Sequence, residues 1–404
     1  MTYRRAAIPA LAGGLLLTAL LWWAGASVNA LHLAGTTEVL GGRAAAELEH
    51  WLAPWSYDAP ASLRYNAEAT GGAGGVAATD GSRYLSLYAT SMQIRFGVLF
   101  AVFMPGALLL VRRLPPVRGR TTAAFLAVWA WGLVAGMLAA TVSAPWQIAS
   151  RGHGSYRFLP QLAGSSSSGQ QITVFAALVA AAATVLAARI TTKGAGPLPL
   201  RQVPARAARL AATVGTTVVA LSLLVLSYQP VAASIQTVSL SGRLLAEPGE
   251  FLRTWLLLGG WAGPAGAPLG TWLLYRVADA LLLAVVWWAL RKLPVLLAPA
   301  TVPAMAAGAV CATVIGLLAR QLLQMALTGA GSGMRWGLVQ LSGGLGGGVP
   351  AALVWGLVAG LLTALTLRLA GGGAEAGDAP APALPDPPAT APAPPTALPD
   401  RSAG

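Results

Sequence analysis

The residues best placed to do chemistry are Arg276 and Asp279, which lie inside an otherwise apolar run at 270–290. A charge is expensive at membrane depth, so an ionisable residue there indicates by default a functional site. Asp279 follows the start of the run by nine residues, or about 14 Å along a helix that rises 1.5 Å per residue. The i,i+3 spacing places both side chains on one helix face, where they can neutralise each other. The pair has two interpretations: a structural ion pair, or part of a proton or solute pathway.

A second set of polar residues, Arg320 and Gln324, lies just beyond the apolar run at 301–319. On the topology inferred below, this arginine lies at the outer end of its helix, against the tendency of basic residues to stay in the cytoplasm. That position favours a buried or substrate-binding role, and we treat this patch as separate from Arg276 and Asp279.

No enzyme motif is present, and we expect neither catalysis nor a cofactor. The histidines His32, His50 and His153 lie outside the apolar runs, and their spacing fits no helical metal pair. A joint role with Glu47 and Glu49 as metal ligands is the weaker alternative. We therefore predict no metal site.

The elements that must position these residues follow from composition. The chain has 404 residues, of which 56% are hydrophobic and 10% charged, far below the roughly 25% charged residues of a soluble domain. The repeated apolar runs, whose bounds are given below, are long enough to cross a bilayer. They must do so as helices, because each run has to satisfy its own backbone hydrogen bonds in lipid. The sequence predicts an all-α polytopic membrane protein with about eight transmembrane helices, at 6–30, 96–111, 121–142, 172–188, 210–228, 270–290, 301–319 and 351–367.

The second run is short. We predict that it extends upstream through Ser91, Met92 and Ile94, which would place Arg95 near an interface, where its long side chain can snorkel to water.

Basic residues predict the topology. The segment 112–120 holds four arginines and the segment 189–209 holds five basic residues, so the positive-inside rule puts both loops in the cytoplasm. Eight spans then put both termini there, in a multi-pass protein of the cytoplasmic membrane whose arginines contact anionic lipids. The net charge of +13 does not indicate nucleic-acid binding, because the basic residues lie between apolar runs.

An internal repeat divides the chain into two halves of four spans each. Three anchors share one offset, 291 − 112 = 179: Arg112-Arg113-Leu114-Pro115 recurs as Arg291-Lys292-Leu293-Pro294, Gln161-Leu162 with Gly164 recurs as Gln340-Leu341 with Gly343, and Arg189 recurs as Arg368. An even number of spans gives the halves the same orientation, so a duplication would relate them by an axis along the membrane normal. Chance alignment of helices rich in Ala, Leu and Gly is the alternative.

The repeat also pairs two arginines and two glutamines. Arg157 and Gln161 in the first half lie near the positions equivalent to Arg335 and Gln340 in the second. These four residues predict either a pseudo-symmetric outer vestibule or, as the plainer interpretation, arginines that anchor helices at the lipid headgroups.

Six segments follow: a first span at 1–30, an extracytoplasmic loop at 31–95, the remaining spans of the first repeat at 96–190, a basic linker at 191–209, the second repeat at 210–370, and a disordered Ala/Pro-rich cytoplasmic tail at 371–404. A cleavable signal peptide is the alternative for the first span. The apolar segment 251–261 is predicted to form an interfacial or re-entrant helix. The small-residue runs 165–169 and 342–348 are predicted to be flexible loops, with close helix packing as the alternative.

Arginine-rich loops, spans of Ala, Leu and Gly, the Arg112-Arg113-Leu114-Pro115 loop and the Ala/Pro tail together resemble hydrophobic multi-span proteins of actinobacteria, in particular the streptophobe-type proteins of Streptomyces. The layout is also similar to duplicated actinobacterial permease-like proteins implicated in cell division. The resemblance implies an inner-membrane location and no catalytic residues. Two functions stay open: a permease or transporter for a small solute, or a non-catalytic scaffold whose aromatic first loop, with Trp51 and Trp55, binds a membrane-protein partner in envelope assembly.

Overall fold

The computed structural model describes residues 3–33, 35–60, 63, 76–114, 120–151, 157–191, 204–239, 247–258, 269–297, 301–328 and 334–370; at 3–4, 37, 76–80, 271, 328 and 334–340 it describes the backbone alone. Within these ranges every regular element is a helix. Eight of the described helices are long and apolar enough to cross a membrane. The predicted all-α polytopic membrane fold is therefore confirmed.

The eight spanning segments are built on α1 (Tyr3–Ala26), α6 (Val76–Arg113), α7 (Thr121–Ser150), α9 (Gln170–Thr191), α10 (Ala205–Ala220), α13 (Leu269–Leu296), α14 (Val302–Thr328) and α15 (Met334–Ala370). Most are longer than the predicted runs, and α6 extends the run at 96–111 by two residues at its C-terminal end and by twenty at its N-terminal end. The helices continue through polar turns whose side chains bond their own backbone, as Thr90 Oγ1 does with the carbonyl of Ser86 at 2.8 Å.

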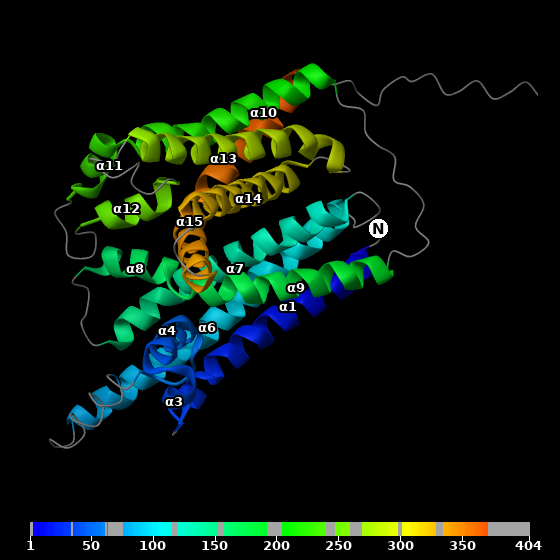
Figure 1. Ribbon diagram of the computed structural model, residues 1–404. Coiled ribbons are helices and arrows are strands. Elements are labelled where there is room, and N and C mark those ends of the chain that lie inside the picture. The colour runs from blue at the N-terminus through cyan, green and yellow to red at the C-terminus, as the bar shows by residue number, and fades with distance from the viewer. Residues whose placement is uncertain are drawn as a thin grey trace, which may run out of the picture.

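The helices form two groups of four with the same pairing. In the first group α1 packs on α6 and α9, and α7 packs on the same two helices; in the second group α10 packs on α13 and α15, and so does α14. Figure 1 shows the first group in the lower part of the view and the second in the upper part. The groups meet where α14 and α15 contact α7 and α9. This pairing agrees with the predicted duplication, which stays a prediction.

Short helices gather at one end of the bundle, which we call the distal end. They are α2 (Val28–Leu31), α3 (Thr36–Leu40), α4 (Gly42–Leu52), η1 (Ala53–Trp55), α8 (Phe158–Ser167), the π-helical η2 (Leu221–Leu226), α11 (Gln229–Gln236) and α12 (Gly249–Leu256). Figure 1 shows α4, α8, α11 and α12 at the left of the view, opposite the N-terminus. The opposite, arginine end carries Arg113, Arg189 and Arg368 in the last turns of α6, α9 and α15.

The small-residue runs are mostly helical, so the prediction of flexible loops was wrong there. Residues 165–167 end α8, and 342–348 lie inside α15. A Cβ at Gly346 would lie 2.4 Å from Cβ of Gln170 in α9, and one at Gly348 would lie 2.9 Å from Leu317 in α14. These glycines let helices approach closely, which was the alternative interpretation.

Other predictions have mixed outcomes. A short helix, α12, overlaps the first part of the segment 251–261. Residues 259–268, most of the linker and the tail at 371–404 lie outside the described residues. The first span belongs to the packed bundle, because Leu17 and Leu21 of α1 are fully buried in the core.

Candidate functional site

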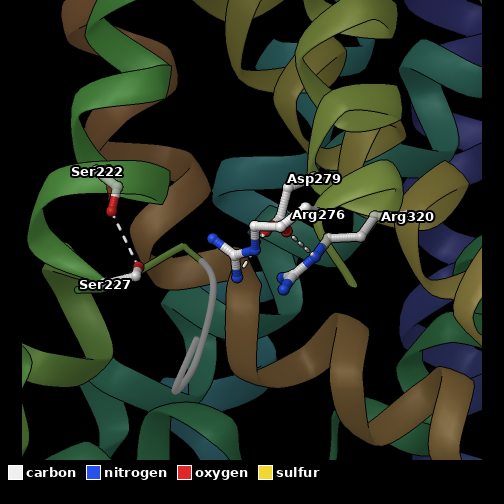
Figure 2. Close-up of polar contacts among 5 residues, drawn as sticks. All are labelled: Ser222, Ser227, Arg276, Asp279 and Arg320. Carbon is white, nitrogen blue, oxygen red and sulfur yellow. Dashed lines mark hydrogen bonds and ion pairs between the residues drawn. The ribbon is translucent and has the colours of Figure 1, made fainter. Parts of the chain in front are cut away.

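Two arginines converge on one buried carboxylate where α13 faces α14. Asp279 Oδ2 lies 3.0 Å from Nη2 of Arg276 on the same helix, as the i,i+3 spacing predicted. Asp279 Oδ1 lies 2.8 Å from Nε of Arg320 on α14. Figure 2 shows both guanidinium groups beside the aspartate. Only 2% of the Asp279 side chain and 8% of the Arg320 side chain are exposed, so this ion pair is shielded from solvent, whereas 25% of the Arg276 side chain is exposed.

The positions of Asp279 and Arg320 along their helices explain why the two side chains meet. The spanning part of α13 starts at Trp272, seven residues before Asp279, and that of α14 ends at Leu327, seven residues after Arg320. Since the two helices run in opposite directions, both residues lie about 10 Å from the distal ends of their spans. Arg320 is thus inside the span, and it joins the aspartate with which the sequence analysis did not associate it. Gln324, one turn further along α14, is half-buried.

Arg320 also faces a pocket, which we call the Arg320 pocket. Its volume is about 360 Å³, and it lies at the distal end between α8, α12, α14 and α15. Its polar walls come from Ser167, Glu250, Arg253, Thr254, Arg320 and Gln321, and its open wall from Gly343, Gly344, Gly347 and Gly348. A Cβ at Gly343 or Gly347 would meet nothing within 4 Å. Glycine at these two positions therefore leaves space where another residue would fill the pocket.

Hydrogen bonds from a serine and a tryptophan fix the α12 wall of this pocket to the bundle. Ser222 Oγ donates to the carbonyl of Leu256 at 2.5 Å and accepts from the amide of Leu258 at 3.2 Å. The indole of Trp355 donates to the same Leu256 carbonyl at 2.8 Å. Ser222 belongs to η2, where the amide of Ser227 bonds the carbonyl five residues earlier, and Figure 2 shows the Ser227 side chain bonded to Ser222 as well. Such π-helical turns often occur at functional sites.

A second buried arginine, Arg95, was not predicted to lie inside the bundle. Only 1% of Arg95 is exposed, and its guanidinium donates to Ser143 Oγ at 2.9 Å, to Gln147 Oε1 at 2.9 Å and to the carbonyl of Pro54. It also lies 5.7 Å from the ring of Trp55. The prediction that Arg95 snorkels at an interface was wrong, because α6 starts far upstream and carries the residue into the bundle.

The predicted vestibule is described in its first half only. Arg157 precedes α8 with a left-handed φ of 60°, and its Nε lies 3.5 Å from Oε2 of Glu247. Gln161 lines a separate pocket. Arg335 and Gln340 lie in α15, with side chains outside the described residues. The pseudo-symmetric vestibule stays a prediction.

The residues weighed as metal ligands make separate contacts. His32 Nε2 lies 3.6 Å from Glu49 Oε1, and Arg43 Nε lies 3.3 Å from Glu47 Oε1. His153 lies outside the described residues. Among the residues that the structure describes, no group of three or more His, Cys, Asp or Glu is placed to hold a metal ion.

No protein-family model, curated protein or solved structure matches the chain. The function must therefore be argued from the geometry of the site.

Proposed function

We propose that this integral membrane protein is a permease for a small anionic solute, which binds to Arg320 in the Arg320 pocket. The observation that carries the proposal is a buried arginine that bonds Asp279 on one side and lines a polar pocket on the other. A volume of about 360 Å³ is at the small end of ligand pockets. With the cluster behind its wall, the pocket has three arginines, Arg253, Arg276 and Arg320, against two carboxylates, Glu250 and Asp279, so it favours an anion.

The ion-pair cluster offers a way to accept that anion. An oxyanion that reaches Arg320 competes with Asp279 for the guanidinium, and Asp279 retains Arg276 as its partner. Each charge stays paired during this exchange, which avoids the large penalty of an unpaired charge in the bundle. Transport further requires that the site open toward the arginine end, as alternating access does in other permeases.

We further propose that the arginine end faces the cytoplasm and that the Arg320 pocket faces outward. The clustered arginines of the loops at 112–120 and 189–209 support this orientation.

Purified protein in proteoliposomes tests the proposal, with charge movement recorded on a solid-supported membrane during jumps of phosphate, acetate, succinate or glutamate. Gly343→Leu fills the pocket without a backbone clash and should abolish the signal. Gly270→Leu is the matched control, because a Cβ at Gly270 also meets nothing within 4 Å and this residue does not line the pocket. A Gly343→Leu protein that transports like wild type, or a wild-type protein that moves none of the four anions, would sink the proposal.

Asp279→Asn tests the role of the carboxylate. If an anion enters with a proton that Asp279 receives, uptake driven by a pH gradient should fall in the variant while counterflow exchange of the same anion persists. An equal loss of both would assign Asp279 a structural role alone.

The scaffold alternative loses Trp55, one of the two tryptophans that suggested it, together with Tyr88 of the same predicted loop. Trp55 and Tyr88 are buried; the indole of Trp55 donates to the carbonyl of Gly169 at 3.0 Å, and the Tyr88 hydroxyl donates to the carbonyl of Ser56 at 2.8 Å. These hydrogen bonds attach η1 and Ser56 to the first group of helices. The side chains of Trp55 and Tyr88 therefore offer no surface to a partner. This favours the permease.

A further inference from the structure

A second pocket lies at the distal end of the first group, and the proposed function leaves it unused. Its volume is about 340 Å³, and η1, α6, α7 and α8 contribute to its lining. We call it the Arg151 pocket, after the arginine in its wall. Its other polar lining includes Tyr88, Gln147 and Ser165.

The two pockets occupy equivalent places in the predicted repeat. Gly164, Ser165 and Ser168 line the Arg151 pocket, and the residues 179 positions later line the Arg320 pocket: Gly343, Gly344 and Gly347. This offset, 343 − 164 = 179, is the one that relates the Arg112-Arg113-Leu114-Pro115 and Arg291-Lys292-Leu293-Pro294 sequences. Three lining positions at the end of α8 thus have counterparts in α15 that line the other pocket. The offset between them is the same as the offset between the two sequences at the opposite end of the bundle.

Packing in the two groups supports the same correspondence. Thr184 of α9 and Thr363 of α15, again 179 positions apart, each donate to the carbonyl four residues earlier at 2.7 Å. Each threonine faces a glycine on the first helix of its group. A Cβ at Gly13 would lie 1.9 Å from Thr184 Oγ1, and a Cβ at Gly215 would lie 2.4 Å from Thr363 Oγ1. The same residue types thus make both close approaches, although the two glycines are 215 − 13 = 202 positions apart and only the threonines share the offset of 179.

We propose that the Arg151 pocket is a second binding site and that it takes a small oxyanion, a phosphate or carboxylate group. Arg95 lies directly behind it: two of the three groups that accept hydrogen bonds from Arg95, Gln147 Oε1 and the Pro54 carbonyl, belong to residues of the pocket wall. The third acceptor is the neutral Ser143 hydroxyl. Arg320 has Asp279 as a counter-ion, whereas the groups that bond Arg95 are all neutral.

The described lining of this pocket contains no carboxylate. Three acidic residues close in sequence to the lining residues His50 and Pro60 contact other groups. Glu47 and Glu49 lie beside Arg43 and His32, and Asp58 Oδ2 accepts from Asn29 at 2.5 Å. Among the described lining residues, Arg151 is the one with a permanent charge, and this charge is positive.

Gln147 supplies a donor as well as a link to Arg95. Arginine has only donors, so the Gln147 oxygen must face Arg95, and the amide N–H groups point elsewhere. An oxyanion in the pocket can accept from these N–H groups and from the guanidinium of Arg151. Charge-assisted bonds of the latter kind are the stronger ones.

The test uses full-length protein in nanodiscs, in a Gly343→Leu background that closes the Arg320 pocket. Inorganic phosphate in phosphatidylcholine nanodiscs should raise the thermal midpoint of this protein. Adding Gly164→Leu should remove the rise, whereas adding Gly97→Leu should not; a Cβ at either glycine meets nothing within 4 Å. Arg151→Gln, which keeps the pocket open, should weaken the apparent phosphate affinity by about tenfold or more.

A second arm distinguishes a free anion from a lipid headgroup. Phosphatidylglycerol nanodiscs without phosphate should give the same Gly164-dependent rise if the headgroup is the ligand. A rise in either arm that Gly164→Leu removes supports the site and names its source. No rise in both arms, or a rise that persists in Gly164→Leu, overturns it. Because the Arg320 pocket is closed throughout, these outcomes do not depend on the proposed transport.

Discussion

Replacing Asp279 with asparagine removes the negative charge between Arg276 and Arg320 and leaves the shape of the side chain almost unchanged. The Nε of Arg320 lies 2.8 Å from the carboxylate, a distance at which the attraction is about 6 kcal/mol for an effective dielectric constant of about 20. Desolvation of the charges offsets part of this. Breaking a buried pair on one side typically costs about 3–5 kcal/mol, and we expect a loss of that size in the free energy of unfolding.

The assay is reversible unfolding in mixed detergent and lipid micelles, followed by tryptophan fluorescence or circular dichroism. Arg320→Gln added to Asp279→Asn should recover at least half of the loss, because it removes the cation left without its partner. Arg276→Gln alone should cost less, about 1 kcal/mol, because a quarter of that side chain is exposed and can reach the interface. The reasoning fails if Asp279→Asn is as stable as wild type, or if the effects of Asp279→Asn and Arg320→Gln add to within about 0.5 kcal/mol.

Three further substitutions probe how the distal segments and the bundle are held. Ser222→Ala removes both hydrogen bonds to the end of α12, so unfolding should become easier by about 1–2 kcal/mol, with faster amide exchange in α12 than in α8. Trp55→Phe removes the bond to the Gly169 carbonyl and weakens the contact with Arg95, which should lower stability by about 1–2 kcal/mol in the same unfolding assay. Gly356→Leu would put a Cβ 2.6 Å from a Cα of α14, and size-exclusion chromatography should show little folded protein.

The fold class was predictable because only helices and closed barrels can span a bilayer. The length of each apolar run was enough to count helices, and this count agrees with the described structure. Helix ends were not predictable in the same way, since polar turns continue a helix wherever protein or interface satisfies them. The second span shows this most clearly: α6 begins at Val76, whereas the apolar run begins at 96.

The sequence predicted one of the two ion pairs of the candidate site. Arg276 and Asp279 share one helix, so their spacing alone implied the contact. Arg320 is 41 positions beyond Asp279, and their meeting depends on which turns of α13 and α14 face each other. The equal seven-residue distance from the span ends is a usable signal, but only when both ends are known. Arg95 was missed because its burial depends on the upstream extension of α6.

The contact between Arg157 and Glu247 has a consequence for how the two groups of helices are joined. Both residues have left-handed backbone, with φ of 60° and 58°, a conformation that costs about 1–2 kcal/mol for a residue with a Cβ. Their ion pair is more than half exposed on both sides and returns at most about 1 kcal/mol, less as salt rises. The distal rim thus holds two residues in a costly backbone conformation at a place where their own ion pair is weak. Glycine adopts this conformation freely, so glycine at either position should relieve the strain there.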